Sequence, residues 1–131
     1  MGKLDIKTAK RIQLIDITED INKTIKEKGV KEGICLAYCP HTTAAITINE
    51  GADPDVKTDL LRHLGKLVPE NGSYKHSEGN SDAHIKSALV GASANIIIKG
   101  GKLLLGKWQS VYFAEFDGPR ERAVYIKIIG D

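Results

Sequence analysis

Residues 95–129, NIIIKGGKLLLGKWQSVYFAEFDGPRERAVYIKII, decide the fold class of this chain. They hold four apolar runs that follow one another directly and are rich in the β-branched and aromatic residues of strands. The runs are residues 95–98, 103–105, 110–116 and 123–129. Gly100-Gly101 predicts a hairpin turn between the first two runs, because glycine accepts the positive φ of a tight turn. Strands in direct succession predict a largely antiparallel sheet.

The rest of the chain adds further strands and three helices. We expect strands within residues 4–17 (two, or one that bends), 34–38 and 44–48, and helices at residues 18–29, 54–67 and 81–91. Thr18, Asp53 and either Asn80 or Ser81 can cap these helices, since their side-chain oxygens accept from free N–H groups. Together the elements predict an α+β fold, with a mostly antiparallel two-sheet sandwich-like core and about three helices, in one domain spanning residues 1–131.

Composition and charge exclude several classes of protein. The chain has 131 residues, 41% of them hydrophobic and 27% charged, which fits a folded globular domain. Its net charge of +2 is too small and too evenly spread to indicate a nucleic-acid partner. No apolar run approaches the roughly 18 residues that span a membrane, and residues 1–13 lack a signal-peptide core. We therefore expect a cytoplasmic protein without nucleic-acid or membrane partners.

The two cysteines, Cys35 and Cys39, fit this location. They lie four residues apart on a predicted strand and so about 13 Å apart, whereas a disulfide needs Cα atoms within about 7 Å. We expect two free thiols, as in a reducing compartment.

Three of the four histidines lie on separate predicted segments. His41 is at a strand edge, His76 is in the polar loop of residues 69–81, and His84 is in the first turn of the third helix. If they converge, they match catalytic zinc sites, which use three protein ligands and keep one position open. We therefore predict a divalent metal, zinc or magnesium, held by these side chains. The alternative is three polar histidines without a shared ligand, because their spacing matches no short metal motif.

Glu50 and two arginines are candidates for chemistry on an anion. Glu50 ends an apolar strand, where a carboxylate can act as a general base or metal ligand, or can simply be solvated. Arg120 and Arg122 alternate along a predicted strand, so both could hold one anion, or line a solvated face.

The segment before the third helix is a second candidate for anion binding. The turn of residues 77–82 leads into a helix N-terminus, where Asn80 and Ser81 can offer free N–H groups to an anion. The same helix end favours the neutral form of His84, which a general base or metal ligand needs. An ordinary capped helix is the alternative.

Several of these residues lie in sequence blocks that resemble the YjbQ-like family. In order from about residue 40 to the end, the blocks are His41-Thr42-Thr43-Ala44-Ala45, Asn49-Glu50, Asp53-Pro54-Asp55-Val56, His76 with Gly79-Asn80, Ala83-His84, Gly106-Lys107-Trp108-Gln109 and Glu115-Phe116-Asp117-Gly118-Pro119-Arg120. The resemblance implies an α+β sandwich-like fold that assembles as a homotrimer. It also favours the three histidines as one site, because all three lie inside these blocks.

The family is often labelled a secondary thiamine-phosphate synthase. The resemblance therefore implies an enzyme that joins a pyrimidine diphosphate to a thiazole phosphate and releases pyrophosphate, a reaction in which cations stabilise the leaving group. The expected catalytic residues are Glu50, His84 and Arg120, and the expected metal ligands are His41, His76 and His84. The expected substrate-binding residues are Asn80, Ser81, Trp108, Gln109, Arg120 and Arg122.

Two other functions fit the same residues. A metal-dependent hydrolase would use the histidines to hold an ion and act on a phosphorylated small molecule. A non-catalytic binding module would hold an anionic metabolite in the same pocket without turnover.

Overall fold

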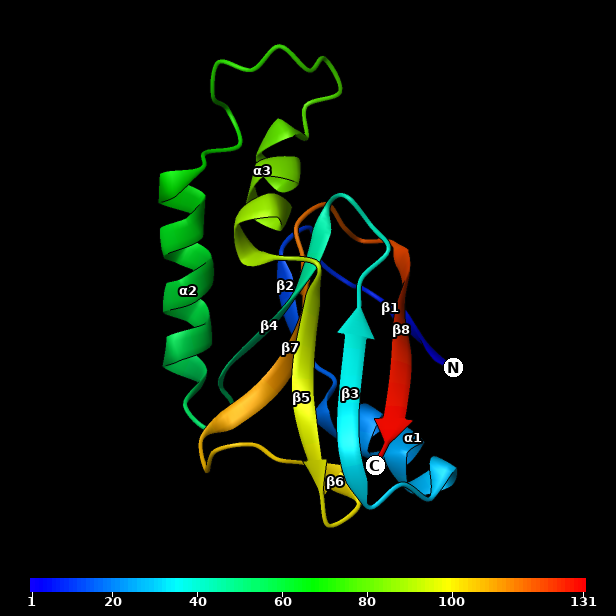
Figure 1. The fold of residues 1–131 in the computed structure, drawn as a ribbon. Helices are drawn as coiled ribbons and strands as arrows, with labels where there is room; N and C mark the ends of the chain where they lie inside the picture. Colours follow the sequence, from blue (N-terminus) through cyan, green and yellow to red (C-terminus); the bar gives the residue numbers. More distant parts are fainter.

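Eight strands form two antiparallel sheets and three helices pack around them in the computed structural model, which describes all 131 residues (Figure 1). The strands are β1 (Gly2–Lys7), β2 (Gln13–Asp16), β3 (Glu32–Tyr38), β4 (Ala44–Glu50), β5 (Ser93–Lys99), β6 (Lys102–Leu103), β7 (Gln109–Glu115) and β8 (Glu121–Gly130). The helices are α1 (Thr18–Lys28), α2 (Pro54–Leu67) and α3 (Ser81–Val90). None of them combines the length and apolar character needed to cross a membrane. The predicted α+β class with two antiparallel sheets is confirmed.

The two sheets pack face to face and enclose the main core. One has the strand order β1-β8-β3-β5-β6 and the other has the order β2-β7-β4. The buried residues between them come from both sheets and from α1, and include Ile21, Ile46, Phe113, Val124 and Ile126. The two predicted opening strands therefore belong to different sheets, and the chain crosses from one sheet to the other between β1 and β2.

The three-stranded sheet is covered on its second face by α2 and α3, so β7 is buried on both sides (Figure 1). Leu60 and Leu64 of α2 and Ala83 of α3 pack against a second buried cluster that contains Tyr112 and Phe116. This double cover explains why the β7 sequence is continuously apolar and does not alternate with polar residues.

The turn prediction is confirmed, and the cap prediction for α1 is wrong. Gly100 and Gly101 have φ of 62° and 80° and form the turn between β5 and β6. Thr18 does not cap α1, because its hydroxyl accepts from the backbone N–H of Val111 at 2.8 Å. The carboxylate of Asp16 instead accepts a hydrogen bond from the free N–H of Thr18, at 3.0 Å, at the start of the helix.

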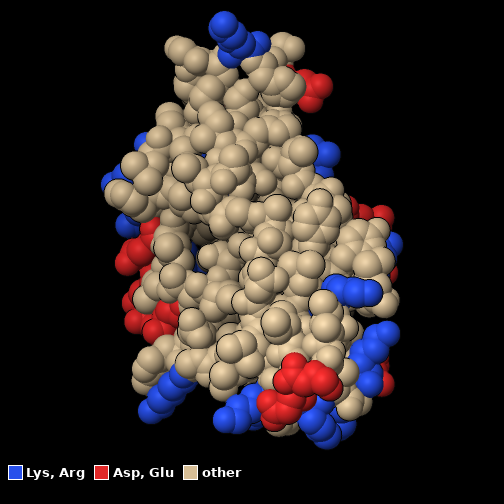
Figure 2. All heavy atoms as spheres, in the orientation of Figure 1, with Lys and Arg blue, Asp and Glu red and all other residues tan.

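The outer face of the five-stranded sheet carries exposed apolar side chains. Ile97 of β5 and Ile129 of β8 lie opposite Ile34 of β3, and these residues are 57%, 63% and 50% exposed. Figure 2, in the orientation of Figure 1, shows a broad uncharged surface over these strands with charged side chains gathered at its rim. We call this surface the apolar sheet face, made of Ile34, Leu36, Tyr38, Ile97, Tyr125 and Ile129; Asn95 and Lys127 lie on the same face, opposite Leu36.

Candidate functional site

The loops at one end of the two sheets gather most of the polar residues that the sequence singled out. The β1–β2, β3–β4 and β7–β8 loops meet there, next to the start of α3 (Figure 1). Hydrogen bonds connect these loops into one network, which we call the polar end. It consists of Thr8, Arg11, His41, Thr43, Asn80, Asp82, Lys86, Glu115, Asp117, Arg120 and Arg122.

A buried ion pair between Arg122 and Glu115 joins the two sheets inside the polar end. Arg122 Nε donates to Glu115 Oε1 at 2.8 Å, and Arg122 Nη2 donates to Glu115 Oε2. The Thr8 hydroxyl donates to Glu115 Oε1, and Arg122 Nη2 also donates to Thr43 Oγ1, both at 2.8 Å. The arginine and glutamate side chains are 5% and 0% exposed. Burial alone would raise the pKa of Glu115, but the hydrogen bonds from Arg122 and Thr8 hold it below its usual range.

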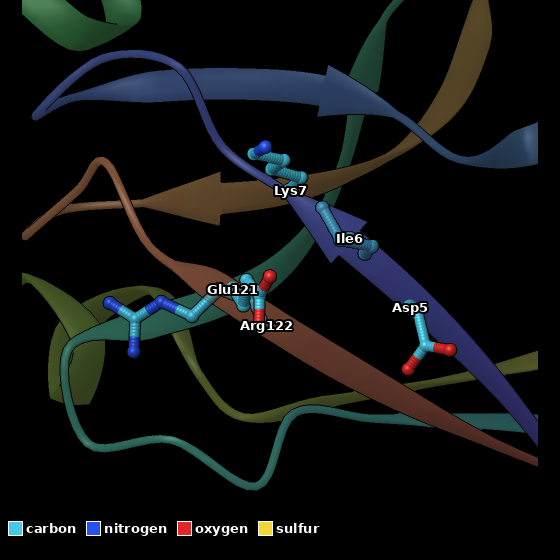
Figure 3. A pocket seen from close by; sticks show the side chains of 5 residues that line it. All are labelled: Asp5, Ile6, Lys7, Glu121 and Arg122. Atoms are coloured by element: carbon cyan, nitrogen blue, oxygen red, sulfur yellow. The ribbon is translucent and has the colours of Figure 1, made fainter.

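Arg122 is therefore not free to share an anion with Arg120, and that prediction is wrong. Figure 3 shows the guanidinium group of Arg122 extending away from Asp5 and Lys7. These three residues help to line an open surface pocket of about 390 Å³. The side chain turns into the space between the sheets because the buried carboxylate of Glu115 needs a counter-charge there.

A second buried cluster attaches the start of α3 to the β1–β2 loop. Both terminal nitrogens of Arg11 donate to the Asp82 carboxylate, at 3.2 and 3.0 Å, and Lys86 Nζ donates to it at 2.9 Å. Asp82 and Lys86 are fully buried. Burial opposes ionisation of Asp82, but the bonds from Arg11 and Lys86 outweigh it and keep its pKa below the usual range. This carboxylate lies in the first turn of α3, where Arg11 and Lys86 balance its negative charge.

The β7–β8 loop contacts both clusters, because Asp117 N–H donates to Glu115 Oε2 and Gly118 N–H donates to the backbone oxygen of Arg11. The loop also presents an exposed guanidinium group. Asn80 Nδ2 donates to Asp117 Oδ2 at 2.8 Å, and the predicted side-chain cap of α3 is absent because Asn80 Oδ1 accepts no hydrogen bond. Arg120 donates to Asp117 through Nε at 2.7 Å and Nη2 at 2.9 Å, yet its side chain is 53% exposed. Asn80 Oδ1 is the one buried side-chain polar atom without a partner, which leaves an acceptor for a donor group of a ligand.

His76 and His84 come together, as the predicted shared site requires. Their ring centroids are 5.4 Å apart and the ring planes are nearly perpendicular, at 86°. His76 Nε2 also lies 3.6 Å from a carboxylate oxygen of Glu78. The two rings line a pocket of about 310 Å³, which we call the histidine pocket, together with Tyr74, Lys75, Ser81 and Ile85. The predicted ligand-binding residue Ser81 thus lies in the same pocket as the two histidines.

His41 does not join this pair, so the predicted three-histidine metal site is not assembled within one chain. Its Nε2 accepts from the backbone N–H of Ala123 at 3.0 Å, which occupies the lone pair that a metal would use. No group of three or more His, Cys, Asp or Glu side chains is placed to hold one metal ion. The residues of a single chain therefore do not fit the predicted zinc or magnesium centre.

Glu50, Trp108 and Gln109 lie at the opposite end of the three-stranded sheet from the polar end. Glu50 pairs with Gln109 at one end of the β4–β7 ladder, and Ala44 pairs with Glu115 at the other. Six residue steps separate these ends, which is about 20 Å along a strand. The prediction that Glu50 acts beside the histidines and Arg120, with Trp108 and Gln109 in the same pocket, is therefore wrong for a single chain.

Two antiparallel sheets with a buried ion network and paired histidines at one end define the class of protein. The chain belongs to the YjbQ-like UPF0047 family, because the family model described as "UPF0047 protein YjbQ-like" matches residues 2–131. The resemblance seen from about residue 40 onward is confirmed and extends through the N-terminal strands.

Relatives and solved structures agree with this assignment. UPF0047 protein MJ1081 of Methanocaldococcus jannaschii is 61% identical over 129 residues, which cover 98% of this chain and 94% of the relative. UPF0047 protein YugU of Bacillus subtilis is 54% identical over 128 residues, 97% of each chain. An uncharacterized conserved protein of the same family from Clostridium acetobutylicum, 55% identical, matches with a TM-score of 0.96 over 98% of this chain and 100% of that chain. A YbjQ-like protein of unknown function from Sulfolobus solfataricus, 33% identical, matches with a TM-score of 0.95 over 99% and 96%.

Sequence reasoning missed most of the residues that hold the polar end together. Thr8 and Arg11 carry no local signal, because their partners lie 107 and 71 positions away in the chain. The spacing of Asp82 and Lys86, four residues apart on a predicted helix, is the one pattern that indicates a pair.

We expect acid to destabilise the protein through Glu115 and Asp82. Both folded-state pKa values lie below the unperturbed values of 4.5 and 3.8, so the two groups contribute stability that is complete above those values. This contribution is lost as the pH falls from the unperturbed pKa values through the lower folded-state values. Urea unfolding at a series of pH values from about 6 to about 3 measures the loss. Glu115→Gln should make the free energy of unfolding depend less on pH, whereas Glu27→Gln, at an exposed position on α1, should not. A wild-type free energy of unfolding that stays constant across this pH range contradicts the prediction.

Proposed function

We propose that this protein is an enzyme of phosphate-ester or diphosphate chemistry that binds a small phosphorylated molecule at the polar end. The observation that carries the proposal is the hydrogen-bonded chain Asn80–Asp117–Arg120. It holds an exposed guanidinium group close to the start of α3, the helix that bears His84. A planar guanidinium group matches phosphate oxygens, and a position that is fixed before binding favours affinity.

The histidine pocket offers two imidazole groups that can exchange protons with a ligand. The rings of His76 and His84 are close enough for one to donate a proton to a ligand while the other accepts one. Lys75 and Ser81 line the same pocket and can bind phosphate oxygens. In diphosphate chemistry, cations stabilise the charge of the leaving group, and Arg120 and Lys75 fit that role.

The narrower activity that we propose is thiamine-phosphate synthesis, in which a pyrimidine diphosphate and a thiazole phosphate combine and pyrophosphate leaves. Both substrates carry phosphate groups, so the cations and histidines described above suit both of them. A metal-dependent version, including a hydrolase, needs ligands beyond those of one chain. The second candidate is a non-catalytic module for an anionic metabolite, which the exposed Arg120 supports without requiring turnover.

Replacing Arg120 by alanine is expected to weaken pyrophosphate binding about tenfold or more, because hydrogen bonds to charged groups contribute about 1.5–3 kcal/mol. Titration calorimetry with pyrophosphate measures the affinity. Arg62→Ala removes an exposed arginine of α2 that makes none of the hydrogen bonds of the polar end, and should leave the affinity unchanged. Equal affinities of the wild type and Arg120→Ala would argue against a phosphate site at this loop.

Turnover separates the enzyme from the binding module. Product release is measured from the pyrimidine diphosphate with the thiazole phosphate, and from simple phosphate esters, with and without a chelator. The enzyme proposal expects His84→Ala to lose turnover while it still binds pyrophosphate. Binding without turnover on any of these substrates would support the module.

We further propose that the chain assembles as a homotrimer through the apolar sheet face. Contact between copies would remove Ile34, Ile97 and Ile129 from water, and exposed apolar patches of this kind often mark interfaces. The same face carries both charge signs, since Glu32 and Lys99 lie opposite each other at its border. Three copies around one axis, each in contact with the other two, can therefore bring opposite charges together around an apolar centre.

We also propose a cytoplasmic location. Cys35 and Cys39 are buried free thiols, as predicted. Burial raises the pKa of both thiols, that of Cys35 to about 11, so neither is prepared for oxidation. Two unpaired cysteines in a small domain suit a reducing compartment.

A further inference from the structure

One contact of His41 determines which of its ring nitrogens carries a proton. Its Nε2 lies 3.0 Å from the backbone nitrogen of Ala123. A backbone N–H group can only donate a hydrogen bond, so Nε2 must be the acceptor and cannot itself be protonated. The neutral ring therefore carries its single proton on Nδ1.

The groups around His41 favour this neutral form. Burial and then the positive charge of Arg122 lower the pKa of His41. Glu115 acts in the opposite direction, but its charge is balanced by Arg122 in the buried ion pair. Cys39, whose sulfur lies 4.0 Å from the backbone oxygen of His41, has a pKa raised by burial and adds no charge.

The Nδ1–H group of His41 has no partner within the protein and is not fully buried. No hydrogen bond joins it to the protein, since the bond from Ala123 to Nε2 is the one that the ring makes. Nδ1 must reach the surface, because Asn80 Oδ1 is the only buried side-chain polar atom that lacks a hydrogen-bond partner. The exposed residues Pro40 and Thr42 lie on either side of it in the chain.

We propose that His41 is a neutral hydrogen-bond donor, whose Nδ1–H binds an oxygen atom of an anionic ligand, and not a metal ligand. The backbone amide of Ala123 positions the ring and fixes the tautomer. The choice of a phosphate oxygen as the acceptor rests on the proposed function, whereas the tautomer follows from the contact itself. His41 then polarises the ligand without exchanging a proton, unlike His76 and His84.

The tautomer is tested by two-bond ¹H–¹⁵N spectra of histidine-labelled wild-type protein. We expect His41 to show a protonated Nδ1 and an unprotonated Nε2 at about pH 7. Added Zn²⁺ should leave its signals in place, whatever happens at His76 and His84. A protonated Nε2, or a zinc-dependent shift of the His41 ring, would overturn the proposal.

The donor role is tested by adding pyrophosphate to the same sample. We expect the Nδ1 signals of His41 to shift as the ligand binds. A response confined to His76 and His84 overturns the role of His41 and leaves the proposed function standing. No response at any histidine refutes both.

Two variants of His41 separate its donor from its acceptor. His41→Asn keeps an N–H group near the position of Nδ1, whereas His41→Gln keeps an acceptor near Nε2 for the amide of Ala123. His41→Gln should lose about tenfold in pyrophosphate affinity, as expected for one hydrogen bond to a charged group, and His41→Asn should keep more of it. The reverse order overturns the proposal. His63→Asn, on the exposed side of α2, is the matched control.

Discussion

Arg122→Met is expected to lower the free energy of unfolding by about 3–5 kcal/mol, because it leaves the buried carboxylate of Glu115 without its counter-charge. The Thr8 hydroxyl still donates to that carboxylate, but it carries no charge. Methionine has a volume close to that of arginine, so loss of charge dominates over loss of packing. Urea unfolding followed by circular dichroism measures the change.

Two further variants make this expectation specific. In the double variant Glu115→Leu with Arg122→Met both charges are gone, and much of the stability should return, since apolar side chains often replace a buried ion pair at little cost. Arg62→Met, on the exposed surface of α2, should change stability by less than about 0.5 kcal/mol. A loss below about 1 kcal/mol for Arg122→Met would show that the pair is not needed to join the sheets.

Ile97→Lys is expected to convert the proposed homotrimer to a monomer. Ile97 lies opposite Ile34 at the middle of the apolar sheet face, and a lysine there would place a charge at the centre of the proposed contact. Sedimentation equilibrium should report three times the 14.3 kDa chain mass for the wild type and a single chain for the variant.

The control for this experiment is Leu67→Lys, which changes an equally exposed apolar residue at the end of α2. It should leave the trimer intact, because Leu67 is not part of the apolar sheet face. A monomeric wild type, or an Ile97→Lys variant that stays trimeric, would rule out assembly through this surface.

Local patterns predicted the elements of the fold well because their causes are local. The helix at residues 54–67 begins and ends where its cap and apolar spacing place it, and Asp53 accepts from Asp55 N–H as an N-cap should. The cap prediction for Thr18 failed because a distant backbone donor, Val111 N–H, competes for the hydroxyl. Nothing near Thr18 in the chain indicates that competitor.

The candidate site was predicted in part. His76 and His84 are eight residues apart and flank the start of one helix, so their meeting depends on a short segment. His41 and Glu50 were assigned to the same site on the basis of residue type, but the β4 strand carries Glu50 to the far end of the sheet. The type of a residue does not indicate at which end of the sheet its side chain will lie.

The order of helices and strands, the turns and the free thiols could be deduced from the chain alone, because periodicity, glycine and strand spacing act between near neighbours. The polar end became visible only in the folded molecule, where Glu115 meets Thr8 and Arg122, and Asp82 meets Arg11. A charged side chain that is removed from water needs an opposite charge or a hydrogen-bonding partner beside it. The packing of the two sheets determines which of these groups lies within reach. The same packing turned Arg122 inward and left Arg120 exposed, where we propose that it binds a ligand.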